Sequence, residues 1–223
     1  MNQLKKLFIA LALCAPLTAA AQDITINEEN FPDENFRNYL LEQDYGADGV
    51  ITEAEVAGIT DISVYMKNIS SLKGIEHFTA LEYLNCTSNQ LTALDVSKNT
   101  ALTWLYCCKN QIKNDSMDVL VNSLTETADG RLYVYDESAS AEGNVITQTQ
   151  VAVAKTKGWT PYYTSDGGWN WVEYEGSDDT NTSIALPELE NGTAVVYTLQ
   201  GQKVTAPQKG GIYIVNDKKM VVK

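Results

Sequence analysis

The sequence contains a single histidine, His77, and this leaves almost no material for a histidine-based catalytic triad or a histidine-rich metal site. Cations are also scarce: 16 Lys and Arg stand against 29 Asp and Glu, for a formal net charge of −13. Such a surface repels phosphate backbones and anionic headgroups, so we expect neither nucleic acid nor a membrane surface as partner. No apolar run reaches the length of about 18 residues that a membrane-spanning helix needs. The hydrophobic fraction of 44% nevertheless predicts a globular protein.

The first 21 residues have the three parts of a secretory signal peptide. Lys5 and Lys6 form a basic start, residues 7–13 are apolar, and small residues at 19–21 precede Gln22. We therefore predict cleavage near Ala21 and a protein that is secreted or lies on the outer cell surface. Three cysteines remain after cleavage, an odd number that cannot pair fully within the chain.

A repeat dominates the middle of the sequence. Residues 81–91 read LEYLNCTSNQL and residues 102–112 read LTWLYCCKNQI, at an offset of 21; residues 59–69, ITDISVYMKNI, fit at an offset of 22 with Lys67 in place of Asn. This is the LxxLxLxxNxL pattern of the leucine-rich repeat. Each LxL segment predicts a short parallel strand with its leucines inward, and the Asn is expected to bond backbone groups where the chain turns. One repeat cannot bury its apolar side alone, so the repeats should stack into a solenoid.

The cysteines fall at defined places in this repeat. Cys86 and Cys107 occupy inward positions of successive strands, where they are either buried free thiols or a strained disulfide. Cys108 lies on the outer side and is expected to be exposed.

The flanks of the repeats predict caps for the ends of the solenoid. We expect helices at residues 33–43, 116–124 and 147–157, a strand at 131–135 and a closing hairpin within 159–174. The fold class is thus α/β, with a helical N-terminal cap in residues 22–57 and with repeats plus a C-terminal cap in residues 58–176. An aromatic group in that last stretch either covers the core of the last repeat or stacks sugars: Trp159, Tyr162, Tyr163, Trp169, Trp171 and Tyr174.

Several strings resemble exported leucine-rich-repeat proteins of the Bacteroidetes type: FPDENFRNYLL, SSLKGIEHFTALEYL, LDVSKNTAL and VAVAKTKGWTPYY. The resemblance covers roughly residues 24–176. It implies a secreted or cell-surface recognition protein and brings no catalytic residues with it.

Residues 44–55, DYGADGVITEAE, resemble the calcium-binding loop of an EF-hand. Asp44, Asp48 and Glu55 stand at positions 1, 5 and 12, and Val50 would offer its carbonyl at position 7. Gly46 at position 3 removes one ligand, so no metal is required and any calcium should bind weakly. The alternative is a metal-free cap in which Thr52 and Glu55 form a capping box.

Residues that alternate with the inward leucines should form a ligand-binding face on the inner curve of the solenoid. Large aromatics concentrate there, and aromatics bury much area at little cost in side-chain entropy. The alternative is that they pack on one another and only stiffen the sheet. The candidate ligand-binding residues are Tyr83, Asn85, Trp104, Tyr106, Tyr133 and Tyr135.

The composition changes after residue 176. Residues 177–183 are polar and acidic and predict a linker, and residues 184–223 predict a small antiparallel β segment with strands near 194–199, 202–204, 211–216 and 219–222. The strings VVYTLQGQKV and GGIYIVNDKKMVVK are similar to a sorting domain of the type IX secretion system. That resemblance implies the secretion machinery as a partner; the alternative is a permanent β module.

Together these patterns predict a non-catalytic recognition protein for a protein, peptide or glycan at the cell surface. One alternative is a structural spacer without a ligand of its own. Another is a hydrolase that uses Cys108 or paired carboxylates, although His77 lies in a different segment from Cys108.

Overall fold

The computed structural model describes residues 23–178 and four strand segments, 196–198, 203–204, 212–215 and 218–221. In residues 23–178 short strands alternate with helices. The elements are β1 Ile24–Thr25, α1 Glu34–Leu41, β2 Val50–Ile51, α2 Glu53–Val56, β3 Asp61–Ser63, the 3-10 helix η1 Ile75–His77, β4 Tyr83–Asn85, β5 Trp104–Tyr106, α3 Asp115–Ser123, β6 Gly130–Asp136, α4 Gln148–Thr156, β7 Trp159–Thr164 and β8 Val172–Glu173.

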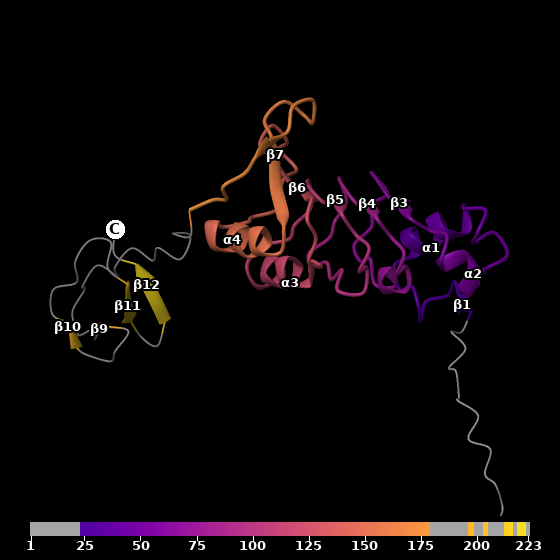
Figure 1. The fold of residues 1–223 in the computed structure, drawn as a ribbon, viewed down its shortest axis with the longest axis horizontal. Coiled ribbons are helices and arrows are strands. Elements are labelled where there is room, and N and C mark those ends of the chain that lie inside the picture. Colours follow the sequence, from indigo (N-terminus) through magenta and orange to yellow (C-terminus); the bar gives the residue numbers. More distant parts are fainter. Residues whose placement is uncertain (1–22, 179–195, 199–202, 205–211, 216–217, 222–223) are drawn as a thin grey trace, which may run out of the picture.

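A six-stranded sheet in the order β3-β4-β5-β6-β7-β8 organises this unit. The first five strands are parallel neighbours, and β8 folds back antiparallel to β7. Figure 1 shows β3 to β7 following one another along the long axis, with α3 and α4 beneath the β5–β7 end and α1 at the other end. The predicted stack of parallel strands is confirmed, and the predicted closing hairpin is β7 and β8.

The apolar core runs along one face of the sheet. Ile62, Leu84, Leu105 and Leu132 lie in register on adjacent strands and are fully buried. Full burial of such a side chain stabilises the fold by about 1.5–3 kcal/mol. Spacings of 22, 21 and 27 residues thus bring equivalent apolar side chains side by side.

A ladder of asparagines closes the turns after β4 and β5. The Asn89 side chain donates to the carbonyl oxygens of Val64 and Cys86 at 2.8 and 2.9 Å, and Asn110 donates to those of Cys86 and Cys107 at 3.0 and 2.9 Å. Both side chains are buried, so these bonds satisfy carbonyl groups that water does not reach. The predicted role of the repeat asparagine is confirmed.

The N-terminal helices are tied to the first repeat by polar contacts. Asp33 caps α1 by accepting from the Phe36 N–H at 3.0 Å, and its other oxygen accepts from the Ser70 N–H and hydroxyl at 2.8 and 2.7 Å. One carboxylate thus joins a helix start to a segment 37 residues away.

The C-terminal end of the core is closed by Trp159. Its indole is 1% exposed, and its Nε1–H donates to the Thr125 carbonyl oxygen at 2.7 Å. Helices α3 and α4 occupy the regions predicted as helices downstream of the repeats.

The four tail segments are strands of a separate antiparallel sheet in the order β10-β9-β11-β12. Their bounds are β9 Val196–Thr198, β10 Lys203–Val204, β11 Ile212–Val215 and β12 Lys218–Val221. They fall within one or two residues of the predicted strands. The signal peptide and the linker beyond residue 178 lie outside the described residues, so the domain boundaries placed there stay predictions.

Candidate ligand-binding face

Strand register brings most of the candidate residues together on the sheet face opposite the leucine core. Tyr83 pairs with Trp104, and Asn85 pairs with Tyr106, which in turn pairs with Tyr133. Successive residues of a strand point to opposite faces, so these side chains lie on the face opposite to the leucines. We call the aromatic surface formed in this way the tyrosine face; its members are Tyr83, Trp104, Tyr106, Tyr133, Tyr162 and Trp171.

The phenol rings form a stacked ladder along this face. The Tyr106 and Tyr133 rings are nearly parallel, at 5° with centroids 3.9 Å apart, and Tyr133 stacks on Tyr162 at 5.1 Å and 20°. Tyr83 lies 5.6 Å from Tyr106 at the other end of the ladder. Because parallel strands lie about 4.8 Å apart, residues in register bring their rings to stacking distance. The ladder is therefore a rigid surface.

Trp171 and Arg131 border the ladder. The edge of the Trp171 ring system meets Tyr133 at 4.9 Å and 77° and Tyr106 at 6.1 Å and 81°. The Arg131 guanidinium lies over the Trp104 ring at 4.6 Å and forms an ion pair with Asp129 at 3.3 Å. The cation of this face is thus already engaged by an indole and a carboxylate.

The Tyr106 hydroxyl in the middle of the ladder remains neutral at physiological pH. Burial raises the pKa of Tyr106, and the neighbouring Tyr133 hydroxyl raises it further. A neutral phenol both donates and accepts a hydrogen bond. Tyr106 therefore offers a partner an uncharged hydroxyl group that both donates and accepts.

Tyr135 is displaced from the face on which the sequence predicted it. The register between β6 and β7 shifts after Tyr133, so that Tyr135 pairs with Tyr163. Such a bulge re-aims the following side chain. The Tyr135 ring stacks on Tyr174 at 5.4 Å, and Tyr174 in turn lies 5.3 Å from Tyr163.

Tyr162 and Trp171 were expected in the C-terminal cap, and the structure places both on the tyrosine face. The alternation of side chains along residues 159–164 is the sequence feature that indicates this position for Tyr162. Trp159 and Pro161 are buried on one side of the strand, and Tyr162 pairs with Tyr133 on the other. Trp169, predicted in the same cap group, is 88% exposed.

The three cysteines within residues 23–178 are buried free thiols that directly follow β4 and β5. Cys86 and Cys107 are fully buried, and Cys108 is 3% exposed, so the expected exposure of Cys108 is wrong. Cys108 lies beside Thr87, with 3.6 Å between its sulfur and the Thr87 hydroxyl, and burial raises the pKa of its thiol to about 11. The ring contact of His77 is with Phe31, which belongs to the N-terminal part of the core. The geometry therefore offers no accessible thiolate nucleophile among the described residues.

Two carboxylates, of Asp136 and Glu142, lie at the turn after β6, and both are engaged by other groups. Asp136, almost fully buried, forms an ion pair with the Lys109 ammonium at 2.8 Å and accepts from the Ser138 hydroxyl at 2.6 Å. Glu142 accepts from the Lys109, Asp136 and Asn144 N–H groups at 2.7–2.9 Å. These contacts fasten the 137–143 loop to the repeats, which is a structural role.

The calcium-loop residues are arranged as a capped turn. Gly49 has a φ of 85°, Ile51 is buried, and Val50 belongs to β2, which pairs with β1. Glu55 is turned toward Thr52, accepting from its N–H and its hydroxyl at 2.8 Å each, in a capping box. Within the described ranges, no three His, Cys, Asp or Glu residues gather into a group that could hold a metal ion. Asp44, Asp48, Val50 and Glu55 remain a predicted ligand set.

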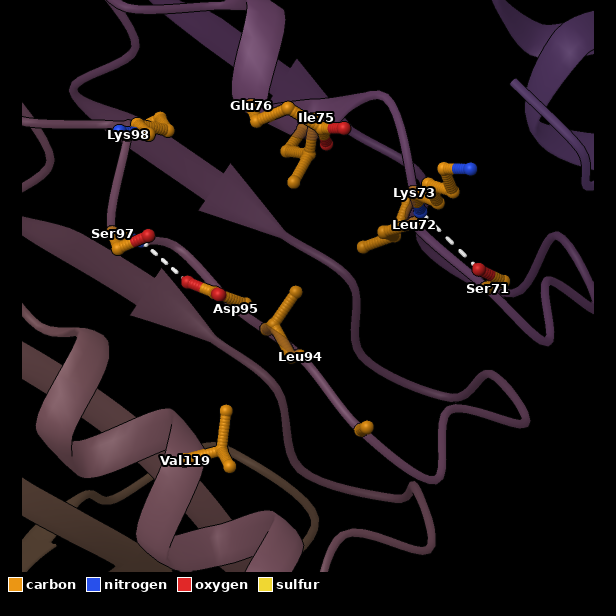
Figure 2. A pocket seen from close by; sticks show the side chains of 11 residues that line it. Ser71, Leu72, Lys73, Ile75, Glu76, Leu94, Asp95, Ser97, Lys98 and Val119 are labelled. Carbon is orange, nitrogen blue, oxygen red and sulfur yellow. Dashed lines mark hydrogen bonds between the residues drawn. The ribbon is translucent and has the colours of Figure 1, made fainter. Parts of the chain in front are cut away.

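A groove of about 410 Å³ lies away from the tyrosine face, between the segment that contains η1, residues 93–98 and α3 (Figure 2). Leu72, Ile75, Leu94 and Val119 supply its apolar lining. Its two marked hydrogen bonds, Lys73 N–H to the Ser71 hydroxyl and Ser97 N–H to Asp95, are local turns. No cysteine or histidine lines it, so it offers no catalytic pair.

Comparisons with known proteins find partial similarity to leucine-rich-repeat proteins. No family model matches the chain. Internalin J of Listeria monocytogenes is 38% identical over 71 residues, which cover 31% of this chain and 8% of that protein. The chain therefore spans less than a tenth of the length of this curated relative.

Two solved structures from the same organism are similar in part. The functional domain of InlJ, described as including a cysteine ladder, is 29% identical with a TM-score of 0.39, over 56% of this chain and 30% of that chain. Internalin InlF is 27% identical with a TM-score of 0.47, over 65% and 39% of the two chains. The relatives are thus Listeria internalins, which are leucine-rich-repeat proteins. The resemblances to the Bacteroidetes type and to a type IX sorting domain stay predictions.

Proposed function

We propose that this chain is an exported, non-catalytic recognition protein that binds a protein or peptide through the tyrosine face. The single observation that carries the proposal is the in-register ladder of Tyr106, Tyr133 and Tyr162, flanked by Trp104 and Trp171. Aromatic side chains already held in place lose little entropy when a partner docks, as in tyrosine-rich antibody surfaces. The sequence similarity to an internalin supports a protein-binding role at a cell surface.

The stacking favours a protein or peptide over a glycan. A sugar ring recognised by an aromatic residue lies flat on the ring face, but the faces of Tyr106 and Tyr133 cover each other at 3.9 Å. The Trp104 ring is similarly covered by Arg131. Ring edges and hydroxyl groups remain available, and these suit the mixed apolar and polar surface of a polypeptide.

Export rests on the predicted signal peptide, and the described residues contain no helix that is long and apolar enough to cross a bilayer. We also propose that residues 184–223 act as a type IX sorting segment, on the strength of the sequence resemblance. A permanent β module is the alternative. Comparing the mass of the exported protein with that of residues 22–223 distinguishes the two, because a sorting segment is removed after export.

The test is a binding screen of residues 22–223 against extracellular-matrix proteins, their peptides and mucin glycans. A Trp104→Ala/Tyr106→Ala variant removes the centre of the tyrosine face. Tyr163→Ala is the matched control, because it removes a tyrosine from the same sheet whose ring contact is Tyr174, outside the face. Binding that is lost only in the double variant, with circular dichroism unchanged, supports the proposal. Equal binding by both variants rejects this face, and no binding to any polypeptide or glycan favours the spacer.

A further inference from the structure

The loop between β7 and β8 holds a tryptophan in water. Trp169 is 88% exposed, more than any other large hydrophobic residue that the structure describes. In Figure 1 this loop extends beyond the end of β7, away from α3 and α4. Exposed indoles are enriched at sites of partner binding, so this position needs an explanation.

The backbone of the loop around Trp169 is held by the hydrogen bonds of Asp166. One oxygen of Asp166 accepts from the Thr164 hydroxyl at 2.7 Å and from the N–H groups of Trp169 and Asn170 at 3.1 and 3.0 Å. Its other oxygen accepts from the Asn170 side chain at 2.6 Å. Gly167 has a φ of 79°, a conformation that a residue with a Cβ rarely adopts. These contacts fix the backbone on both sides of the indole.

This arm is continuous with the tyrosine face. Trp171, two residues after Trp169, contacts Tyr133 and Tyr106 edge-on, and Glu173 pairs with Tyr162 across β7 and β8. A partner lying on the phenol ladder therefore meets the arm at the C-terminal end of the sheet.

The charges of the arm have one sign. Between residues 159 and 174 the charged side chains are Asp166 and Glu173, whereas Glu175 beyond β8 is paired with Lys155 of α4 at 3.0 Å. Hydrogen bonds from the Asn170 N–H and the Thr164 hydroxyl lower the pKa of Asp166 to about 2, so its carboxylate is ionised at any physiological pH. Glu173 is also exposed. An uncovered indole on an arm that carries only carboxylates is chemically suited to a cationic side chain.

We propose that the β7–β8 arm is the anchoring site for a protein partner, and that Trp169 receives an arginine or lysine side chain of that partner beside Asp166 and Glu173. The remainder of the cationic segment lies along the tyrosine face. This inference rests on the proposed function, because it names the chemistry of the partner for that same surface.

The test uses residues 22–223 and a fluorescent peptide, acetyl-Gly-Arg-Ser-Arg-Gly-Arg-Ser-Arg-Gly-amide, with a citrulline version as the uncharged control. Fluorescence anisotropy is measured at about 150 mM salt, where long-range attraction is largely screened. Trp169→Ala should weaken binding of the arginine peptide roughly threefold to thirtyfold. The citrulline peptide should bind the wild type and both variants more weakly than the arginine peptide binds the wild type. Val172→Ala, which removes another exposed apolar side chain of the arm, should leave the affinity within about twofold.

Trp169→Ala changes no charge and removes an exposed side chain, so its melting temperature should match that of the wild type. Equal affinity of the wild type and Trp169→Ala for the arginine peptide overturns the inference, because binding is then unspecific attraction to an acidic protein. Absence of peptide binding overturns it too. A partner from the earlier screen that needs Trp104 and Tyr106 but tolerates Trp169→Ala also overturns the inference, while the proposed function stands.

Discussion

Replacing Asn110 by alanine probes the ladder that holds the repeats together. The Asn110 amide is fully buried; it donates to the Cys86 and Cys107 carbonyl oxygens and accepts from the Leu91 N–H at 2.9 Å. Alanine leaves the Leu91 N–H in the core without a partner, whereas the Cys86 and Cys107 carbonyl oxygens each lose one of two bonds and keep those from Asn89 and Asn144. One unsatisfied buried N–H costs about 1–3 kcal/mol, and the loss of a second hydrogen bond at the two carbonyl oxygens adds about 1 kcal/mol, so we expect a loss of roughly 2–4 kcal/mol.

That loss is a large part of the 5–15 kcal/mol by which a domain of this kind is typically stable. The assay is urea unfolding followed by circular dichroism. Asn122→Ala is the matched control, because Asn122 is exposed and makes one bond, to the Asp118 carbonyl oxygen at 2.8 Å; its effect should stay within about 0.5 kcal/mol. Equal unfolding free energies for the two variants would refute the structural role assigned to the ladder.

Three further predictions follow from buried or capped groups. In a chain that starts at Gln22, the three thiols should resist a thiol reagent at pH 8 until denaturant is added, because burial raises the pKa of Cys108 to about 11; rapid reaction of the folded protein would contradict their burial. Burial raises the pKa of Asp33, but the hydrogen bonds from Ser70 and Phe36 outweigh it and lower the pKa overall, so the stability from this group is present above an unfolded pKa of about 3.9 and is lost as pH falls through the folded pKa. Asp33→Ala should therefore cost about 1–2 kcal/mol at pH 7 and less at pH 2, and a difference independent of pH would exclude this origin. If calcium binds with the weak affinity of extracellular sites, 10 mM calcium should add about 1.4–2.7 kcal/mol of stability that Glu55→Gln removes, whereas an unchanged melting temperature identifies the metal-free cap.

The repeated part of the fold was predictable because periodicity fixes register. An offset of 21 residues places Leu84 beside Leu105 and Tyr83 beside Trp104, and the parallel pairing follows from that spacing. The buried asparagines Asn89 and Asn110 were predictable for the same reason, since each closes the turn of its own repeat.

The remainder depends on contacts that break the period. Asn144 continues the asparagine ladder by donating to the Cys107 carbonyl oxygen at 2.8 Å, but it follows Asn110 by 34 residues because the connection that contains α3 and the 137–143 loop both lengthen this repeat. The bulge in β6 moves Tyr135 off the face, and Tyr162 joins the face because β7 continues the sheet beyond the recognisable repeats. Pattern alone does not locate such a bulge, since it requires one extra residue in one of two strands.

Hydroxyl-radical footprinting tests the central claim most directly, because tyrosine and tryptophan side chains are read out one by one. The measurement compares residues 22–223 alone and with a polypeptide that binds in the screen. Our account predicts protection of Tyr83, Tyr106, Tyr162 and Trp171, with Tyr163 unchanged. Protection confined to the groove at Leu94 and Val119, with the tyrosines equally oxidised in both samples, would contradict it.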